Sequence, residues 1–169
     1  MDVTLADVDE MRLAELVGAA RTEAAADEVT PPVTKGGGWT DERTAWFRAY
    51  HRDRRVGLGR PAGEATWAVV LSGAVVGAAR LRWTADPGVA DTGLWLTRSA
   101  RGAGVGWAAL LAVLELAAAA GVREVHADTT AANTAALTVL RHLGFAVAEP
   151  DDDGRVRAVV APGSASPRD

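Results

Sequence analysis

The feature that most constrains this chain is a glycine-rich turn between an apolar segment and a long stretch of alanine and leucine. Residues 94–107 read Leu-Trp-Leu-Thr-Arg-Ser-Ala-Arg-Gly-Ala-Gly-Val-Gly-Trp. Without Cβ atoms, Gly102, Gly104 and Gly106 let the backbone turn tightly and lie close to a ligand. The first N–H groups of the following helix have no partner within the helix, and the helix dipole adds positive potential. The turn therefore predicts a site for an anion such as pyrophosphate, with a plain tight connection as the alternative.

Two nucleotide-binding motifs can be tested against this turn by their spacing. A P-loop needs Gly-Lys-Ser/Thr after its first glycine and four further residues, and the turn lacks that lysine and hydroxyl. A dinucleotide motif needs G-x-G-x-x-G, whereas this turn has G-x-G-x-G, with Asp128 at about the spacing of a ribose-binding acid. A dinucleotide-dependent oxidoreductase is thus a less favoured alternative, since predicted hairpins precede the turn and the remaining chain is too short for a doubly wound sheet.

The composition indicates one globular domain. The chain has 169 residues, of which 49% are hydrophobic and 24% charged, and it has no cysteine. We expect residues 1–161 to form a single domain around one core, and the small, polar residues 162–169 to form a disordered C-terminal tail. The lack of cysteine excludes disulfides and a cysteine nucleophile, and no histidine and carboxylate spacing suits a metal, so we predict no metal.

Charge and hydropathy limit the predicted partners. There is no apolar run of about 18 residues and no basic-then-apolar N-terminus, which argues against membrane insertion and secretion. The net charge of −4 argues against non-specific nucleic-acid binding. We therefore expect a cytoplasmic protein that binds neither nucleic acid nor membrane.

Hydrophobic periodicity and turn residues predict an α+β fold with a mixed, mostly antiparallel sheet and one long crossover helix. The first helix would start at a capping box of Thr4 and Asp7, and residues 29–38 would be a loop that moves when no substrate is bound. The predicted order is β-α-α-β-β-β-α-β-α-β-β: strand 3–5, helices 6–25 and 41–54, strands 66–71, 74–84 and 90–96, a helix ending at Gly121, strand 122–128, helix 133–143, and strands 145–148 and 156–160. In the crossover helix, Trp107, Leu110, Leu111, Leu114 and Ala118 would face the core.

Two stretches resemble motifs of the GNAT N-acetyltransferase superfamily. Arg101-x-x-Gly104-x-Gly106 is similar to the acyl-CoA pyrophosphate motif. Residues 133–145, from Asn133 to Phe145, resemble the second family motif, N-x-x-A-x-x-x-Y-x-x-x-G-F. Both stand in the family's order on the expected elements, so together they are far more specific than either alone.

Within the superfamily the chain most resembles the RimJ/RimL branch. That similarity rests on residues 90–96, Ala-Asp-Thr-Gly-Leu-Trp-Leu, and on residues 139–145. The branch acetylates N-terminal amines of proteins and, in its relatives, amines of small molecules. The resemblance therefore implies a primary amine as the acceptor.

The resemblance also implies acetyl-CoA as co-substrate and a sheet whose central strands splay apart to admit pantetheine. Backbone groups of Leu94 and Leu96 would hold the pantetheine. Asn133 would contact the pantetheine arm or a nearby water, cap the last helix, or do both. The amides that would hold the pyrophosphate belong to Arg101, Gly102, Ala103, Gly104, Val105, Gly106 and Trp107.

Direct attack of an amine on the thioester requires a group that takes the ammonium proton. The first candidate is Asp91, at a position where RimJ/RimL-like sequences usually carry glutamate. The alternative role for Asp91 is a strand-end carboxylate paired with an arginine.

The leaving thiolate calls for a group that protonates it. The tyrosine that the family usually supplies falls at Leu140, which leaves Tyr50, Thr130 and His126 as candidates. Tyr50 could instead line the acceptor pocket with neighbouring aromatic residues or belong to the core, and His126 could be a core histidine.

Taken together, these features predict an N-acetyltransferase that moves an acetyl group from acetyl-CoA to a primary amine of a small molecule or a peptide N-terminus. The main alternative is a non-catalytic acyl-CoA-binding or regulatory domain, which would explain Leu140. A homodimer is possible, with Trp83, Trp95 and the final strands as its apolar surface.

Overall fold

The computed structural model describes residues 2–59 and 63–164. Their strands are β1 Val3–Asp7, β2 Glu64–Leu71, β3 Ala74–Trp83, β4 Val89–Leu96, β5 Glu124–Thr130, β6 Ala146–Val147 and β7 Arg155–Val160. These strands form one seven-stranded sheet in the order β1-β2-β3-β4-β5-β7-β6. Every neighbouring pair is antiparallel except β4 and β5, which are parallel and joined by a long helical crossover.

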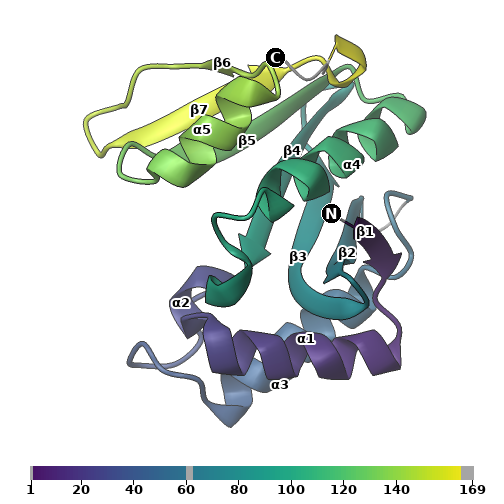
Figure 1. Ribbon diagram of the computed structural model, residues 1–169, viewed down its shortest axis with the longest axis vertical. Helices are drawn as coiled ribbons and strands as arrows, with labels where there is room; N and C mark the ends of the chain where they lie inside the picture. The colour runs from purple at the N-terminus through teal and green to yellow at the C-terminus, as the bar shows by residue number, and fades with distance from the viewer. Residues whose placement is uncertain (1, 60–62, 165–169) are drawn as a thin grey trace.

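The helices cover the sheet on both faces (Figure 1). They are α1 Glu10–Glu23, α2 Ala26–Val29, α3 Asp41–Asp53, α4 Val105–Ala119 and α5 Thr134–His142, with the 3-10 helices η1 Arg98–Ala100 and η2 Pro162–Ser164. The predicted α+β fold and order of elements are confirmed, apart from the short α2 and the 3-10 turns. No helix among the described residues is long and apolar enough to cross a membrane.

The predicted start of the first helix is wrong. Thr4 lies inside β1, and Asp9 caps α1 by accepting a 2.8 Å hydrogen bond from the N–H of Arg12. An aspartate at the position before the first helical turn satisfies an otherwise unpaired N–H, so it sets the boundary better than the Thr4 spacing did. The longer β1 that results pairs along the whole of its length with β2.

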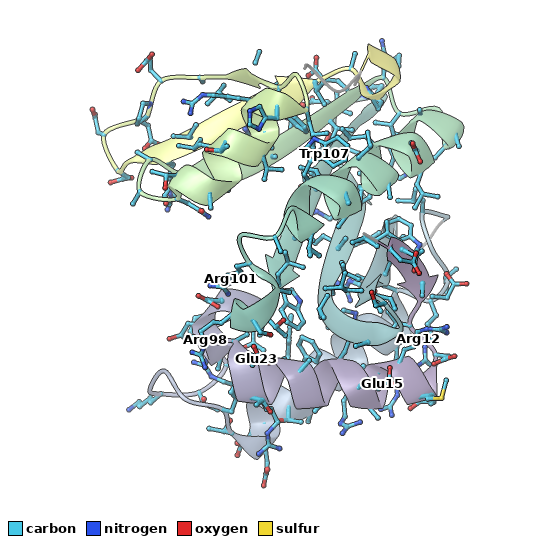
Figure 2. The ribbon with its side chains drawn as sticks, viewed as in Figure 1. Arg12, Glu15, Glu23, Arg98, Arg101 and Trp107 are labelled. Carbon is cyan, nitrogen blue, oxygen red and sulfur yellow. The ribbon has the colours of Figure 1, made fainter. Side chains whose placement is uncertain are left out.

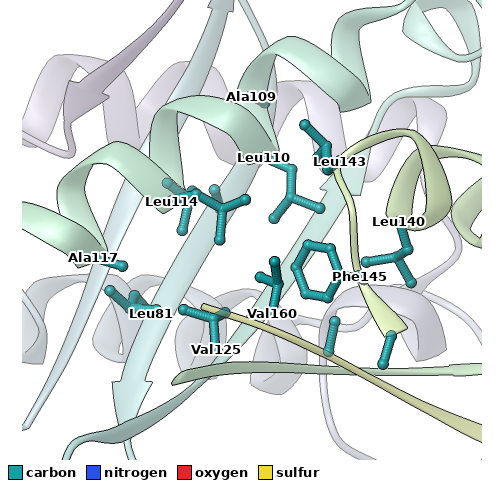
Figure 3. Close-up of a cluster of buried hydrophobic side chains, with 14 of the residues drawn as sticks. Leu81, Ala109, Leu110, Leu114, Ala117, Val125, Leu140, Leu143, Phe145 and Val160 are labelled. Carbon is teal, nitrogen blue, oxygen red and sulfur yellow. The ribbon is translucent and has the colours of Figure 1, made fainter. Parts of the chain in front are cut away.

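The larger of two hydrophobic clusters lies between the sheet and the face covered by α4 and α5 (Figure 3). In α4 the fully buried positions include Ala109, Val113 and Ala117, whereas Ala118 is exposed. Of the five predicted core residues, Leu110 and Leu114 are buried, and Trp107 and Leu111 are half-buried against the cluster. Only Ala118 was wrongly assigned to the core. In an alanine-rich helix, apolar residues lie on every side and the periodicity marks the buried face only weakly.

The smaller cluster joins α1 and α3 to the opposite face of the sheet, around Leu13, Leu16 and Phe47. Trp95 packs against Phe47 there, with ring centroids 6.2 Å apart. Trp95 is half-buried in this cluster, so part of its side chain is used within the protein, and the homodimer stays a prediction. At the other end of the chain, Pro162–Ser164 form η2 where a disordered tail was predicted, and residues 165–169 lie outside the described residues.

The fold contradicts the dinucleotide alternative. A doubly wound sheet needs parallel strands on both sides of its switch point, whereas here only β4 and β5 are parallel. Asp128, the predicted ribose ligand, pairs with Arg157 through two hydrogen bonds of 2.8 Å.

Candidate functional site

The two parallel strands separate halfway along their length. β4 and β5 pair from Val89 and Glu124 to Thr92 and Ala127. Beyond that point, Gly93 to Leu96 pair only with β3, and Asp128 to Thr130 pair only with β7. Figure 1 shows β5 and β7 turning away from β4. The sheet therefore opens on a wedge whose facing edges carry unpaired backbone groups.

The glycine turn lies at the open end of this wedge. Gly102 and Gly104 have φ of +80° and +79°, values that L-residues rarely adopt. Within the described chain, the N–H groups of Gly102, Ala103 and Gly104 donate to no backbone or side-chain acceptor. These amides directly precede the N-terminus of α4, a fifteen-residue helix whose N-cap has no side-chain hydrogen bond, as in known anion sites.

The first turn of α4 sits directly on the end of β4. A Cβ built on Gly106 would lie 3.6 Å from Leu96 Cδ1 and 3.7 Å from Leu94 Cδ2. The structure thus brings together the amides predicted to hold pyrophosphate, from 101 to 107, with the leucines predicted to hold pantetheine. Trp107 follows in the same turn and is half-buried against the larger core cluster.

Arg101 points away from the turn. Its Nε donates to the carbonyl oxygen of Leu96 at 3.0 Å, and its Nη2 contacts Glu28 Oε2 in α2 at 3.0 Å. Figure 2 shows Arg98 and Arg101 on the side of the turn that faces Glu23 at the end of α1. The side chain of Arg101 therefore ties the turn to α2, while its backbone remains part of the turn.

The loop that follows α2 is held by a buried arginine. The guanidinium of Arg43 in α3 donates to Thr34 Oγ1 at 3.1 Å, to the carbonyl of Gly36 at 2.8 Å and to Asp27 Oδ1 at 2.6 Å. Only 1% of the Arg43 side chain is exposed. These bonds restrain the middle of the segment for which we predicted motion, and its mobility stays a prediction.

The two faces of the sheet differ in chemistry at the apex of the wedge. Ala90 and Ala127 are buried in the apolar cluster under α4. On the opposite face, Asp91 of β4 is the Cα partner of His126 of β5. A ligand that approaches from the face of the sheet covered by α4 would thus reach the polar face only by passing between β4 and β5.

Asp91 is held by two arginines. Its Oδ2 accepts from Arg82 Nη2 at 2.6 Å and from Arg82 Nε at 3.2 Å. Its Oδ1 is buried, lies 3.3 Å from Arg80 Nη1, and accepts no well-oriented hydrogen bond from the described residues. The arginine-paired role is therefore present, and both oxygens of the carboxylate lie within ion-pair distance of an arginine.

Tyr50 belongs to the same polar network, at its other end. Its hydroxyl donates to Glu64 Oε1 at 2.6 Å, and Arg80 lies between Glu64, at 3.5 Å, and Asp91. Burial, followed by the hydrogen bond to Glu64, raises the pKa of Tyr50 to about 12. Tyr50 therefore stays protonated and bonded to Glu64, on the α3 side of Asp91.

The second family motif adopts the predicted local structure. Asn133 caps α5, where its Oδ1 accepts from the N–H of Ala136 at 3.1 Å. Its side-chain N–H group has no acceptor among the described residues, so a ligand contact remains compatible with capping. Leu140 is 4% exposed and packs with Phe145 and Leu143 in the core (Figure 3).

Two polar groups of this face were not found from the sequence. Glu64 organises Tyr50, Arg54 and Arg80, and only the tertiary fold brings these four together. Glu124 contacts His126, with Oε1 and Nε2 2.6 Å apart. The second pair had a signal in the sequence, because residues i and i+2 of a strand lie on one face.

A separate hollow of about 830 Å³ lies at the other end of β4, lined by Leu58, Trp83 and residues 84–88 among others. At about 3.3 Å per residue, the length of β4 places it roughly 20 Å from the glycine turn. None of the predicted site residues lines it.

Comparisons with known proteins agree with this architecture. A family model described as acetyltransferase (GNAT) domain matches residues 3–146. No curated protein sequence matches the chain at a significant level.

Solved structures share the fold at low sequence identity. RimJ of Mycobacterium smegmatis, in complex with a CoA disulfide, has a TM-score of 0.72 and 22% identity over 94% of this chain and 81% of its own. A RimL ribosomal alpha-N-protein acetyltransferase in complex with coenzyme A has a TM-score of 0.70 and 16% identity, over 94% and 93% of the two chains. The PaiA N-acetyltransferase of Thermoplasma acidophilum in complex with coenzyme A has a TM-score of 0.65 and 16% identity, over 95% and 99%. With most of its length matched by the family model, the chain belongs to the GNAT acetyltransferase domain family.

Proposed function

We propose that this protein is an N-acetyltransferase that moves the acetyl group of acetyl-CoA to a primary amine in a ternary complex. The observation that carries the proposal is the wedge between β4 and β5, which begins after Thr92 and Ala127 and opens beside the unused amides of the glycine turn. Such an arrangement suits a long ligand with an anionic end and a neutral arm that fits between two strand edges.

In this proposal the cofactor lies with its pyrophosphate at the amides of residues 101–107. Pantetheine runs along Leu94 and Leu96, whose backbone groups facing β5 have no strand partner. The carbonyl of Leu96 is bonded to Arg101 Nε, which leaves the N–H of Leu96 and both groups of Leu94 for the cofactor. Asn133 is close to the same path at the start of α5, and its side-chain N–H group is the atom we propose for contact. The thioester then reaches the apex of the wedge near Thr92 and Gly93.

The acceptor amine approaches from the opposite, polar face, where α3 and the 29–38 loop form its wall. The neutral amine attacks the thioester carbonyl, the C–S bond breaks, and CoA leaves as the thiol. A backbone N–H of β4 at the apex would polarise the carbonyl, and most of the rate would come from positioning. No covalent enzyme intermediate is required.

Asp91 is the catalytic carboxylate of this proposal. Its side chain is 19% exposed beside the apex, where its charge would attract the acceptor ammonium. Tyr50 lies farther along the network, with its hydroxyl on Glu64, and we propose it as part of the acceptor wall. Its high pKa makes it a proton donor only, so any catalytic role would be as an acid.

For the acceptor we propose the RimJ/RimL branch, and hence a peptide N-terminus or a similar α-amine, as the first class to examine. The RimJ and RimL structures share the fold of this chain, with 22% and 16% sequence identity respectively. The support for the branch comes from residues 90–96, which include Asp91.

The test is thiol release from acetyl-CoA with four amines: a hexapeptide with a free N-terminus, spermidine, kanamycin and an amino-acid amide. Calorimetry with acetyl-CoA alone comes first. We expect micromolar binding and turnover of at least one amine, with Asp91→Ala losing turnover at unchanged cofactor affinity. If acetyl-CoA does not bind, the proposed function fails.

A second function is favoured by one observation, the buried Leu140 in place of the family tyrosine. A non-catalytic acyl-CoA-binding or regulatory domain would bind acetyl-CoA and acetylate none of the four amines. The same experiment therefore separates the two functions.

A further inference from the structure

We propose that His126, oriented by Glu124, is the general base that takes the proton of the acceptor ammonium, while the charge of Asp91 attracts that ammonium. This inference rests on the proposed acetyl transfer. It assigns a catalytic role to a pair of side chains outside the two sequence motifs.

The first argument is position. Asp91 and His126 are Cα partners on neighbouring strands, so their side chains leave the same face of the sheet. The next pair, Thr92 and Ala127, is the last before the strands separate. His126 is therefore one residue below the apex where the thioester ends, a rise of about 3.3 Å. Its side chain is 17% exposed, so it is within reach of a ligand on that face.

The second argument is the state of the imidazole ring. His126 Nε2 lies 2.6 Å from Glu124 Oε1. An ionised carboxylate can only accept, so the hydrogen bond places the proton on Nε2 and the lone pair on Nδ1. No described residue donates to Nδ1. A carboxylate that holds one nitrogen of a histidine fixes its tautomer and stabilises the imidazolium formed when the other nitrogen takes a proton.

The charges around His126 are compatible with that role. On its own strand it is flanked by Glu124 and Asp128, and on β4 by Asp91. Three cations on this face are paired with acids: Arg157 of β7 with Asp128, and Arg82 and Arg80 of β3 with Asp91. Arg80 is also near Glu64, and Arg155 of β7 acts on Asp128 by its charge. An imidazolium would thus form beside three carboxylates.

The proton path balances as follows. His126 takes one proton from the ammonium, and the free amine attacks the thioester to form the C–N bond. As the C–S bond breaks, the nitrogen loses its second proton, and the thiolate takes a proton from the imidazolium. The imidazolium thus serves as the acid in place of the family tyrosine, whose position is taken by Leu140. The products are the amide, the thiol and one proton released to solvent.

The experiment measures kcat, KM and acetyl-CoA affinity for His126→Gln, with the best amine of the four above. His142→Gln is the matched control, because His142 is exposed on α5. We expect His126→Gln to lower kcat by about 10²-fold or more with unchanged acetyl-CoA affinity, and to remove the acidic limb of the pH profile of kcat. Glu124→Gln should give a smaller loss, since it retains an acceptor oxygen but not the charge.

His126→Ala provides a second measurement. Added imidazole should restore part of the turnover of this variant, which would not happen if His126 had only a structural role. Wild-type turnover with His126→Gln as active as His142→Gln would overturn this inference and leave the proposed function intact. An acidic limb that disappears in Asp91→Asn and persists in His126→Gln would also overturn it, in favour of Asp91 as the base. If wild-type protein acetylates no amine, the proposed function itself fails.

Discussion

The residue that best shows the effect of burial is His51 in α3. It is 2% exposed, and its Nδ1 lies 3.0 Å from Thr66 Oγ1. Burial lowers the pKa of His51 to about 4, with Arg54 contributing in the same direction. An aromatic contact with Phe47, at 4.7 Å between ring centroids, holds the ring in the smaller core cluster. From the sequence, the aromatic residues around Tyr50 could form either a wall of the acceptor pocket or part of the core. The structure shows that His51 belongs to the core.

This pKa gives a prediction for stability. A histidine whose pKa is lower in the folded state binds fewer protons there than in the unfolded state. The contribution of His51 to the free energy of unfolding is therefore complete above pH 6.5 and is lost as the pH falls through about 4. The shift from 6.5 to about 4 corresponds to roughly 3 kcal/mol. Between pH 7 and 4, the free energy of unfolding of the wild type should therefore fall by roughly that much more than that of His51→Gln, measured by urea denaturation. Equal pH dependence in the two proteins would contradict it.

At the scale of elements, the glycine turn and α4 act as one unit. α4 begins and ends beside glycines in the left-handed region, Gly104 at φ +79° and Gly121 at φ +78°. Gly102, at φ +80°, lies in the turn itself. A Cβ on either Gly102 or Gly121 would meet no atom within 4 Å, so only backbone strain opposes alanine at each position.

That equivalence gives a matched pair of variants. Gly102→Ala and Gly121→Ala should each lower the free energy of unfolding by about 1 kcal/mol, because both force an L-residue to positive φ. Gly102→Ala should in addition weaken acetyl-CoA binding by about tenfold or more, as its strain distorts the proposed pyrophosphate site. Calorimetry compares the two affinities. An equal affinity for both variants would remove the turn from the cofactor site.

At the scale of the whole molecule, the sheet consists of two parts that meet over a short pairing. β1 to β4 carry α1 and α3, β5 to β7 carry α5, and β4 and β5 are joined from Val89 to Thr92 only. α4 packs on β1, β3 and β4 and also contacts α5, which helps to hold the parts together. A cofactor between the strands would supply the contacts that the separated ends lack.

Acetyl-CoA is therefore expected to protect both edges of the wedge. Hydrogen exchange should slow in residues 93–96 and 128–130 on adding acetyl-CoA, whereas adenosine 3′,5′-bisphosphate, which lacks pantetheine, should slow exchange only near the glycine turn. At a free concentration of 100 times Kd, acetyl-CoA should raise the free energy of unfolding by about 2.7 kcal/mol. Protection confined to the turn with acetyl-CoA itself would contradict the proposed path of pantetheine.

Much of the fold was predictable because its signals are local. The hairpin of β2 and β3 follows from alternation and from the Ser72-Gly73 turn, both of whose residues have positive φ. Residues 133–145 gave α5 with its cap at Asn133. The start of α1 was missed because two capping positions compete there. Ala118 was wrongly assigned to the buried face of α4 because alanine gives little contrast between faces.

By itself, the sequence determined the elements, the glycine turn and the face of each strand on which a side chain lies, since φ preferences, caps and alternation act over a few residues. It did not determine which charge pairs with which. The register of β4 against β5 depends on the packing of α4 across the sheet, and that register alone places His126 beside Asp91 and opens the wedge after Thr92. Non-local contacts of this kind arise from the packing of the whole chain, so the tertiary structure decided where the charged network and the proposed base lie.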